Sequence, residues 1–259
     1  MDGYFNMKPK ISVITVTYNA EKIIGETIES VYSQTFDSYE YIFIDGESSD
    51  DTNQIIDKYE ELLKDKGIKT FHLSEKDNGI YDAMNKAVKY ANGEWIYFLN
   101  AGDSLVDANV FMNVSKYLDP KLAVVYGGTN YIGQDQKAIK TGTADEPNVM
   151  PKHMPFCVQA AFVKKDLQKK YGYRTEYRIS ADYDFFLRLY KDGYGYKRIN
   201  VIVNNYLMGG FSSRNPFKTY IEVGKIREVN GYLNRKSLIY RCKVIRFWII
   251  CKLKEWTEK

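Results

Sequence analysis

Short apolar runs alternate in the first half of the chain with longer segments whose apolar residues recur at helical spacing. The runs rich in β-branched and aromatic residues predict strands at 11–16, 39–44, 68–73, 94–99 and 122–127. Helical spacing predicts helices at 21–34, from about 51, at 80–91 and at 107–118. Strands that alternate with helices form a parallel sheet with helices on both faces. We therefore expect an α/β fold over this half.

The second half has a less regular pattern. Its spacing predicts helices at 160–172 and 179–193, a strand at 196–208 and a flexible loop at 209–215. No internal repeat, low-complexity tract or linker interrupts the chain, so the pattern gives no reason to divide it into independent domains.

Polar residues follow each of the first four predicted strands. The first strand leads into Thr17, Tyr18 and Asn19, and the second into Asp45. The third is followed by the sequence SEKDNG (74–79), and the fourth by NAGD (100–103). Ligands of open α/β sheets bind beyond the carboxyl ends of the strands, so these clusters predict one binding site at that edge.

The composition is that of a globular protein, with 44% hydrophobic and 27% charged residues. Three cysteines without metal-ligand spacing indicate neither a disulfide framework nor a zinc site, and they fit a reducing compartment. The first ten residues, MDGYFNMKPK, lack the apolar core of a signal peptide. No stretch approaches the roughly 20 apolar residues of a membrane span. We expect a cytoplasmic protein.

Charge is distributed unevenly. The net charge is +4, but residues 218–259 hold 11 Lys and Arg against 4 Asp and Glu, which leaves −3 for residues 1–217. Residues 1–217 are mildly acidic, whereas a nucleic-acid-binding domain usually carries a basic surface, so we expect no nucleic-acid partner. The tail mixes cations with aromatic and aliphatic residues, as helices at membrane surfaces do. The alternative is a closing helix that packs on the domain.

The chain lacks the usual phosphate-binding loops, because TYNAEK follows the first strand where a glycine-rich motif would stand. A bound diphosphate would then need a divalent cation held by carboxylates at strand ends, and Asp103 is the best placed. The alternative for Asp103 is a turn or cap residue. Asp45 could accept hydrogen bonds from a base or ribose, or could hold its own turn together.

Two further carboxylates, Asp182 and Asp184, lie at the start of a predicted helix. Both could be caps stabilised by the helix dipole, or one could be a general base. His72 lies inside a predicted strand, where we expect it to pack rather than to catalyse.

These motifs resemble those of the family 2 glycosyltransferases, which are inverting nucleotide-sugar enzymes with the GT-A fold. The resemblance extends from about residue 10 to 215, and its most specific stretch is SEKDNGIYDAMNKAVKYANGEWIYFLNAGD. That stretch is similar to a subgroup found in O-antigen, capsule and exopolysaccharide biosynthesis. The resemblance implies a GT-A domain over 1–217, with a donor-binding half at about 10–130 and an acceptor half at about 131–217. Residues 218–259 would form a basic helical extension.

The resemblance also implies site residues. Asp103 would ligate Mn²⁺ or Mg²⁺, although Ala101 stands in place of the first carboxylate of the family's DxD motif. The role of that first carboxylate, often at the ribose, is left vacant or passes to Asn100, which would be a donor-binding residue. Asp182 would be the catalytic base. Val158 stands where relatives tend to have a histidine, which removes a hydrogen-bonding side chain on the acceptor side. The donor-binding residues would be Thr17, Tyr18, Asn19 and Asp45 at the base and ribose, and Asp77 and Lys86 at the sugar phosphate.

The implied function is metal-dependent, inverting transfer of a sugar from a nucleoside-diphosphate sugar to an acceptor hydroxyl. The acceptor would be a saccharide or a lipid-linked glycan of cell-surface polysaccharide biosynthesis, and the tail would contact the inner face of the cytoplasmic membrane. A catalytically silent nucleotide-sugar-binding protein is the first alternative, because the metal motif is reduced to one carboxylate. A sugar-phosphate nucleotidyltransferase is the second, although its glycine-rich first loop is absent.

Overall fold

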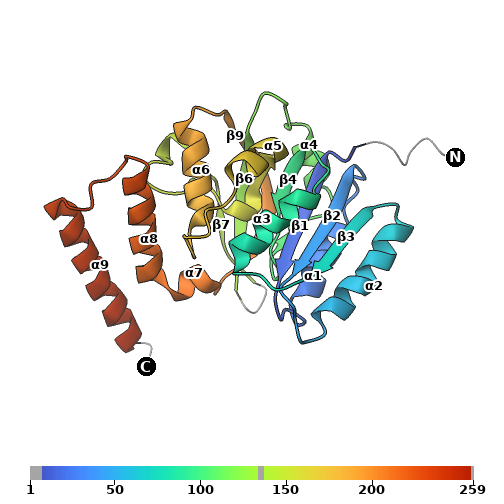
Figure 1. The fold of residues 1–259 in the computed structure, drawn as a ribbon, viewed down its shortest axis with the longest axis horizontal. Helices are drawn as coiled ribbons and strands as arrows, with labels where there is room; N and C mark the ends of the chain where they lie inside the picture. Colours follow the sequence, from blue (N-terminus) through green and yellow to red (C-terminus); the bar gives the residue numbers. More distant parts are fainter. Residues whose placement is uncertain (1–7, 134–136, 258–259) are drawn as a thin grey trace.

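The computed structural model describes residues 8–133 and 137–257. Its described strands form one nine-stranded sheet in the order β3-β2-β1-β4-β8-β6-β9-β5, with β7 paired to β6. Helices cover both faces of this sheet (Figure 1). The strands are β1 (Ile11–Thr17), β2 (Tyr39–Asp45), β3 (Lys69–Ser74), β4 (Trp95–Phe98), β5 (Ser104–Leu105), β6 (Val124–Ile132), β7 (Ala138–Gly142), β8 (Ala161–Lys164) and β9 (Tyr196–Leu207).

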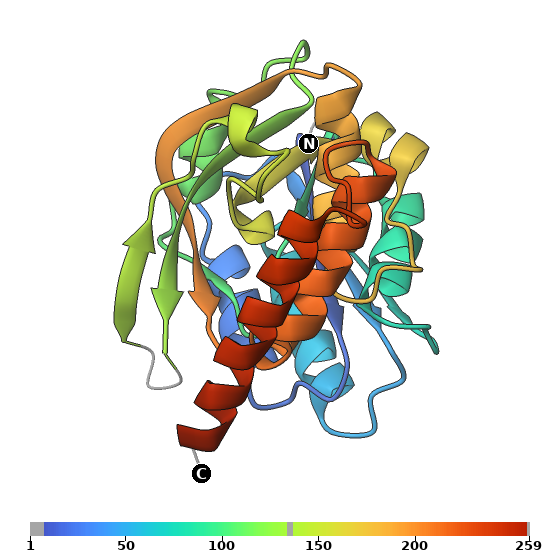
Figure 2. The same ribbon diagram turned by 90° about the vertical axis from the view of Figure 1, so that its left-hand side faces the viewer.

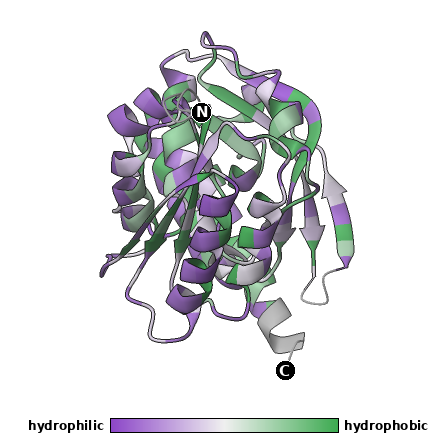
Figure 3. Cartoon of the chain, turned by 90° about the vertical axis from the view of Figure 1, so that its right-hand side faces the viewer, coloured by the Kyte–Doolittle hydropathy of each residue, from purple (hydrophilic) through white to green (hydrophobic). Residues whose placement is uncertain are grey.

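Two apolar layers hold the helices against the sheet. The layer on one face includes residues of α3, α6 and α8, and the layer on the other includes residues of α1, α2 and α4. Figure 3 shows hydrophobic strands between helices whose outer surfaces are hydrophilic. The helices are α1 (Ile24–Tyr32), α2 (Thr52–Asp65), α3 (Ile80–Tyr90), α4 (Val110–Ser115), α5 (Lys165–Tyr171), α6 (Ala181–Lys191), α7 (Phe211–Arg214), α8 (Pro216–Val229) and α9 (Leu238–Thr257), with short 3₁₀ helices at Pro147–Val149 and Val158–Ala160.

The first four strands are parallel, as the alternating pattern predicts. The chain adds β2 and β3 on one side of β1 and then returns to place β4 on the other side. The order therefore reverses between β1 and β4, and the carboxyl ends of these two strands flank the point where open sheets bind ligands.

The second half of the sheet is mixed. Strand β8 runs antiparallel between β4 and β6, whereas β9 is parallel to β6. Residues 161–164, predicted as part of a helix, form β8, because a short buried apolar run fits a central strand as well as a helix. Residues 211–214, predicted as a loop, form the single turn α7.

The C-terminal helices lie at one end of the molecule. Helix α8 packs on α6, and its Ile226 is fully buried. Helix α9 runs beside α8 (Figure 2), where Tyr240 and Phe247 pack on the ring of Tyr220. The division of the chain after residue 217 stays a prediction, and α8 crosses that point. Across residues 8–133 and 137–257, no helix is both long enough and apolar enough to span a membrane.

Candidate active site

Asp103 lies in a tight turn just beyond β4. Gly102 adopts a left-handed conformation with φ of 96°, which favours glycine, and the Asp103 N–H then donates to the Asn100 carbonyl at 3.0 Å. The turn brings the carboxylate to the end of β9, where Asp103 Oδ1 accepts the Leu207 N–H at 2.9 Å. Two distant segments of the chain therefore meet at this carboxylate.

The surroundings of Asp103 favour a cation. Burial raises the pKa of this carboxyl to about 7, and the hydrogen bond from Leu207 offsets only part of that effect. At the ends of β4 and β1, Asn100 Oδ1 and Thr17 Oγ1 are buried and have no hydrogen-bond partner among the described residues. Carboxylate, amide and hydroxyl oxygens are the ligands that Mg²⁺ and similar hard cations prefer. The residues present therefore fit a divalent metal ion.

Asp182 lies in the first turn of α6. Desolvation raises the pKa of its carboxyl to about 6, although the hydrogen bond from the Tyr183 N–H to Oδ1, at 2.7 Å, acts in the opposite direction. The residue keeps partial exposure, so a substrate hydroxyl can approach it. A carboxyl with a pKa just below neutral is suited to accept a proton near pH 7.

Glu222 of α8 fixes the backbone that leads into α6. Its carboxylate accepts the N–H groups of Arg178, Ile179 and Ser180 at 3.0, 2.8 and 2.6 Å. Its negative charge also contributes to the raised pKa of Asp182. The role of Glu222 could not be recognised from the sequence, because its three backbone donors lie 42 to 44 residues away in the chain and form no local pattern with it.

Asp184, the second carboxylate of α6, has a structural environment. It is fully buried, and its oxygens lie 2.8 Å from Arg188 Nε and 3.6 Å from Arg174 Nη1. Asn230 of the segment after α8 donates to it at 3.3 Å. Because both of its oxygens are engaged with these partners, Asp184 is poorly placed to accept a proton from a substrate.

The charges of Asp103 and Asp182 both act on two buried groups, the Tyr206 hydroxyl and the Cys157 thiol. The pKa of Tyr206 is raised to about 12, chiefly by burial and further by the charges of both aspartates. The pKa of the Cys157 thiol is raised to about 12 for the same reasons. A cavity of about 380 Å³ opens beside Cys157 and is also lined by Thr129.

Asp45 joins the loop after β2 to helix α2 and to the end of β3. This buried carboxylate accepts hydrogen bonds from the Ser48 N–H at 2.8 Å, Ser74 Oγ at 2.6 Å and Asn53 Nδ2 at 3.0 Å. Burial raises the pKa of Asp45, but these hydrogen bonds outweigh it and hold the pKa below its usual value. The side chain therefore holds its own turn, which is one of the two roles that the sequence left open.

Asn19 connects the loop after β1 to the loop after β2. It has a positive φ of 47°, and its Oδ1 accepts the Ser49 N–H at 2.9 Å. The neighbouring Tyr18 is 66% exposed, and its ring lies beside Gly46, where a Cβ would come within 3.4 Å. An exposed ring over a glycine-containing turn presents a flat surface on which a nucleotide base could stack.

Asp77 and Lys86 lie beyond β3. A Cβ on Gly46 would lie 2.7 Å from Asp77 Oδ2, so Asp77 is brought to the loop that follows β2. Lys86 Nζ lies 2.9 Å from Glu75 Oε1 and donates to the Lys76 carbonyl at 2.8 Å. Lys86 thereby holds the loop that carries Asp77, and a direct contact of either residue with the donor stays a prediction.

The chain resembles solved glycosyltransferases in its fold. TarS of S. aureus, solved in complex with UDP, has a TM-score of 0.64 and 22% sequence identity over 85% of this chain. The chain spans 65% of the TarS chain. The mannosyltransferase PcManGT from Pyrobaculum calidifontis, in complex with GDP-Man and Mn²⁺, has a TM-score of 0.66 and 19% identity, covering 86% of this chain and 64% of that one. The fold is therefore the GT-A fold of glycosyltransferases.

Sequence comparison gives the family. Residues 12–205 match the family model described as "Glycosyl transferase family 2". A PGL/p-HBAD biosynthesis glycosyltransferase of Mycobacterium tuberculosis is 30% identical over 83% of each chain. The putative teichuronic acid biosynthesis glycosyltransferase TuaG of Bacillus subtilis is 32% identical over half of each. The protein belongs to glycosyltransferase family 2 and is a glycosyltransferase.

Proposed function

We propose that the protein transfers a sugar, with inversion and with the help of a divalent metal, from a nucleoside-diphosphate sugar to an acceptor hydroxyl. The observation that carries this proposal is Asp103, a buried carboxylate between the ends of β4 and β9, with the unpartnered oxygens of Asn100 and Thr17 at the neighbouring ends of β4 and β1. The relatives solved with UDP-GlcNAc, and with GDP-Man and Mn²⁺, support the class of donor and the cofactor.

Asp103 is the proposed metal ligand, with Asn100 Oδ1 as a second oxygen on the same turn. A buried carboxylate is costly to ionise unless a positive charge meets it, and a bound Mn²⁺ or Mg²⁺ would meet that need. When bound, such an ion neutralises the charge that develops on the departing diphosphate. The N–H of Leu207 holds the carboxylate in place.

Asp182 is the proposed general base. It would accept the proton of the acceptor hydroxyl while that oxygen attacks the anomeric carbon and the bond to the diphosphate breaks. The backbone before it is fixed by Glu222, so the carboxylate is presented in one position. One base suffices for direct displacement, and no covalent intermediate is needed.

The donor would bind across the loops at the ends of β1, β2 and β3. Tyr18 offers its exposed ring to the base, whereas Thr17, Asn19 and Asp45 shape the pocket for the base and ribose. Asp77 and Lys86 would approach the sugar phosphate, and the position of Asp77 beside Gly46 at the end of β2 supports this. The 380 Å³ cavity beside Cys157 is the proposed acceptor space. Val158 follows Cys157 at the start of a short 3₁₀ helix, and its side chain carries no hydrogen-bonding group.

The acceptor we propose is a saccharide or lipid-linked saccharide of cell-surface polysaccharide biosynthesis. The names of the relatives, which include teichuronic acid biosynthesis, support this class. Helix α9 exposes Leu238, Ile239 and Trp248 among several cations. Each cation near an anionic leaflet adds about 1 kcal/mol, so α9 would hold the enzyme at the inner face of the cytoplasmic membrane.

Release of nucleoside diphosphate from a panel of UDP-, GDP-, CDP- and dTDP-sugars tests the proposal. We expect release from one class of donor with Mn²⁺, little release with EDTA, and a large loss in Asp103→Asn and Asp182→Asn. Asp37→Asn, an exposed carboxylate in the connection before β2, is the matched control and should behave as wild type. Tight donor binding without release from any donor, with or without saccharide acceptors, would instead indicate a silent nucleotide-sugar-binding protein.

A further inference from the structure

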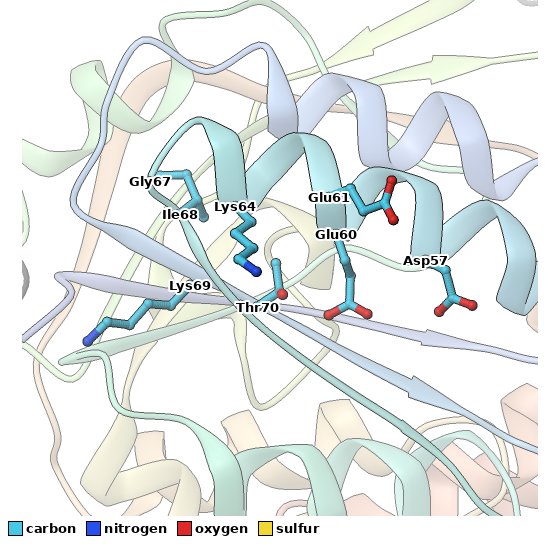
Figure 4. Close-up of a pocket in the computed structure, with 8 residues that line it drawn as sticks. All are labelled: Asp57, Glu60, Glu61, Lys64, Gly67, Ile68, Lys69 and Thr70. Atoms are coloured by element: carbon cyan, nitrogen blue, oxygen red, sulfur yellow. The ribbon is translucent and has the colours of Figure 1, made fainter.

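A second group of metal-ligand side chains lies on α2 and β3, away from the proposed active site. Asp57 and Glu60 lie three residues apart on α2, a spacing that places both on one side of a helix. Their carboxylates point to the same side of α2, whereas that of Glu61 points away (Figure 4). His72 faces them from β3. Strands β2 and β1 lie between β3 and β4, so this group does not share the site of Asp103.

The spacing of these groups matches that of ligands around one small cation. His72 Nδ1 lies 3.4 Å from Asp57 Oδ1 and 3.6 Å from Glu60 Oε2. One ligand atom from each residue lies within 4.8 Å of the other two. Metal–ligand distances of about 2.0–2.1 Å at a tetrahedral Zn²⁺ put its ligand atoms roughly 3.3–3.4 Å apart. Two of the three separations already approach that value.

Hydrogen bonding fixes which nitrogen of His72 carries the proton. Asn53 donates its amide nitrogen to Asp45, which can only accept, so Asn53 Oδ1 faces His72 Nε2 at 3.0 Å. That oxygen is an acceptor, and therefore Nε2 carries a hydrogen. In the neutral ring Nδ1 is then a lone pair that faces two carboxylate oxygens. These three groups need either a proton on Nδ1, which would make His72 an imidazolium paired with the two carboxylates, or a metal ion between them.

We propose that Asp57, Glu60 and His72 bind a divalent transition-metal ion of the Zn²⁺ type, distinct from the metal of the donor site. A histidine whose second nitrogen donates to an oxygen is the usual arrangement at protein zinc sites. Asp57 is well exposed, which leaves the remaining coordination position open to water. The ion would tie α2 to β3 and hold the Asn53 amide that supports Asp45.

Calorimetric titration of metal-free full-length protein with Zn²⁺ tests the site. The Asp103→Asn background removes the proposed donor-site metal. There we expect one Zn²⁺ equivalent, with affinity falling about 100-fold in His72→Gln and at least about 10-fold in Asp57→Asn. Glu61→Gln, from the neighbouring position on α2, is the matched control and should bind as the parent does.

The His72→Gln variant could lose Zn²⁺ binding because it misfolds, so a second measurement keeps all three proposed ligands unchanged. The chain has two histidines, so a His153→Gln variant leaves the ring signals of His72 alone in the NMR spectrum. We expect Co²⁺ to broaden or shift those signals at one equivalent. A parent that binds no Zn²⁺, a His72→Gln protein that binds it equally well, or a His72 ring that keeps protons on both nitrogens in excess Zn²⁺ would overturn the proposal.

Discussion

Replacing Asp103 by asparagine should stabilise the metal-free protein at alkaline pH. The amide has the same shape and still accepts the Leu207 N–H, but it removes the buried charge. The pKa of Asp103 rises from 3.8 to about 7 on folding, a shift of roughly 3 units. At 1.36 kcal/mol per unit, the ionised carboxylate lowers the free energy of unfolding by up to about 4 kcal/mol.

The sign follows from proton binding. Between pH 3.8 and about 7 the folded state binds more protons at Asp103 than the unfolded state, so the contribution of this group to stability falls as pH rises and levels off above 7. The variant should therefore exceed wild type by up to about 4 kcal/mol at pH 8, and by less than about 2 kcal/mol at pH 5. Saturating Mn²⁺, at about 100 times its dissociation constant, should stabilise wild type at this site by about 2.7 kcal/mol. The variant should lack that gain.

Urea unfolding at pH 5 and pH 8, with EDTA or Mn²⁺, measures all of these quantities, and transfer activity should be lost in the variant. A stability difference that is independent of pH, or normal turnover of Asp103→Asn in Mn²⁺, would refute the reasoning and leave Asp103 as a turn residue.

Three further predictions concern the base and the C-terminal helices. In steady-state kinetics, Asp182→Asn should lower turnover about 10²–10⁴-fold with little change in donor affinity. Asp184→Asn should lower turnover less, but in urea unfolding it should destabilise the fold by about 3–5 kcal/mol. The opposite ranking of turnover would move the base to Asp184. Glu222→Gln should shift the acid limb of the pH–rate profile to lower pH, because a charge that raises the pKa of Asp182 is lost, and an unshifted limb would limit Glu222 to a structural role. Truncation after Gly231 removes α9 and should leave folded, donor-binding protein that no longer sediments with anionic liposomes at low salt, whereas unfolding would make α9 structural.

The parallel half of the fold could be predicted because its signals are local. Each of the first strands is a short apolar run bounded by polar residues, and each helix carries one apolar face. The antiparallel insertion of β8 could not be predicted, since pairing partners are set by contacts between distant segments. For the same reason the pattern assigned residues 161–164 to a helix.

The sequence predicted that the site residues lie at the ends of strands, but it did not predict which residues contact one another. Asp103 and Asp182 were singled out from their motifs, and the structure adds the hydrogen bond from Leu207 that joins Asp103 to the end of β9. The hydrogen bonds from the N–H groups of residues 178–180 to Glu222 could not be predicted, because α8 approaches α6 only in the folded chain. The helix pattern left Asp182 and Asp184 equivalent, and the resemblance assigned the base to Asp182. The structure adds the arginine partners of Asp184.

The anomeric configuration of the product tests the central claim most directly. Proton NMR of a transfer reaction, started with the donor identified in the nucleotide-sugar panel and Mn²⁺, reports the configuration at the transferred anomeric carbon, which the new glycosidic bond fixes. Direct displacement assisted by Asp182 predicts a product with the configuration opposite to that of the donor, formed about 10²–10⁴-fold more slowly by Asp182→Asn. A product that retains the donor configuration would contradict the account, because retention cannot arise from one displacement with a single base.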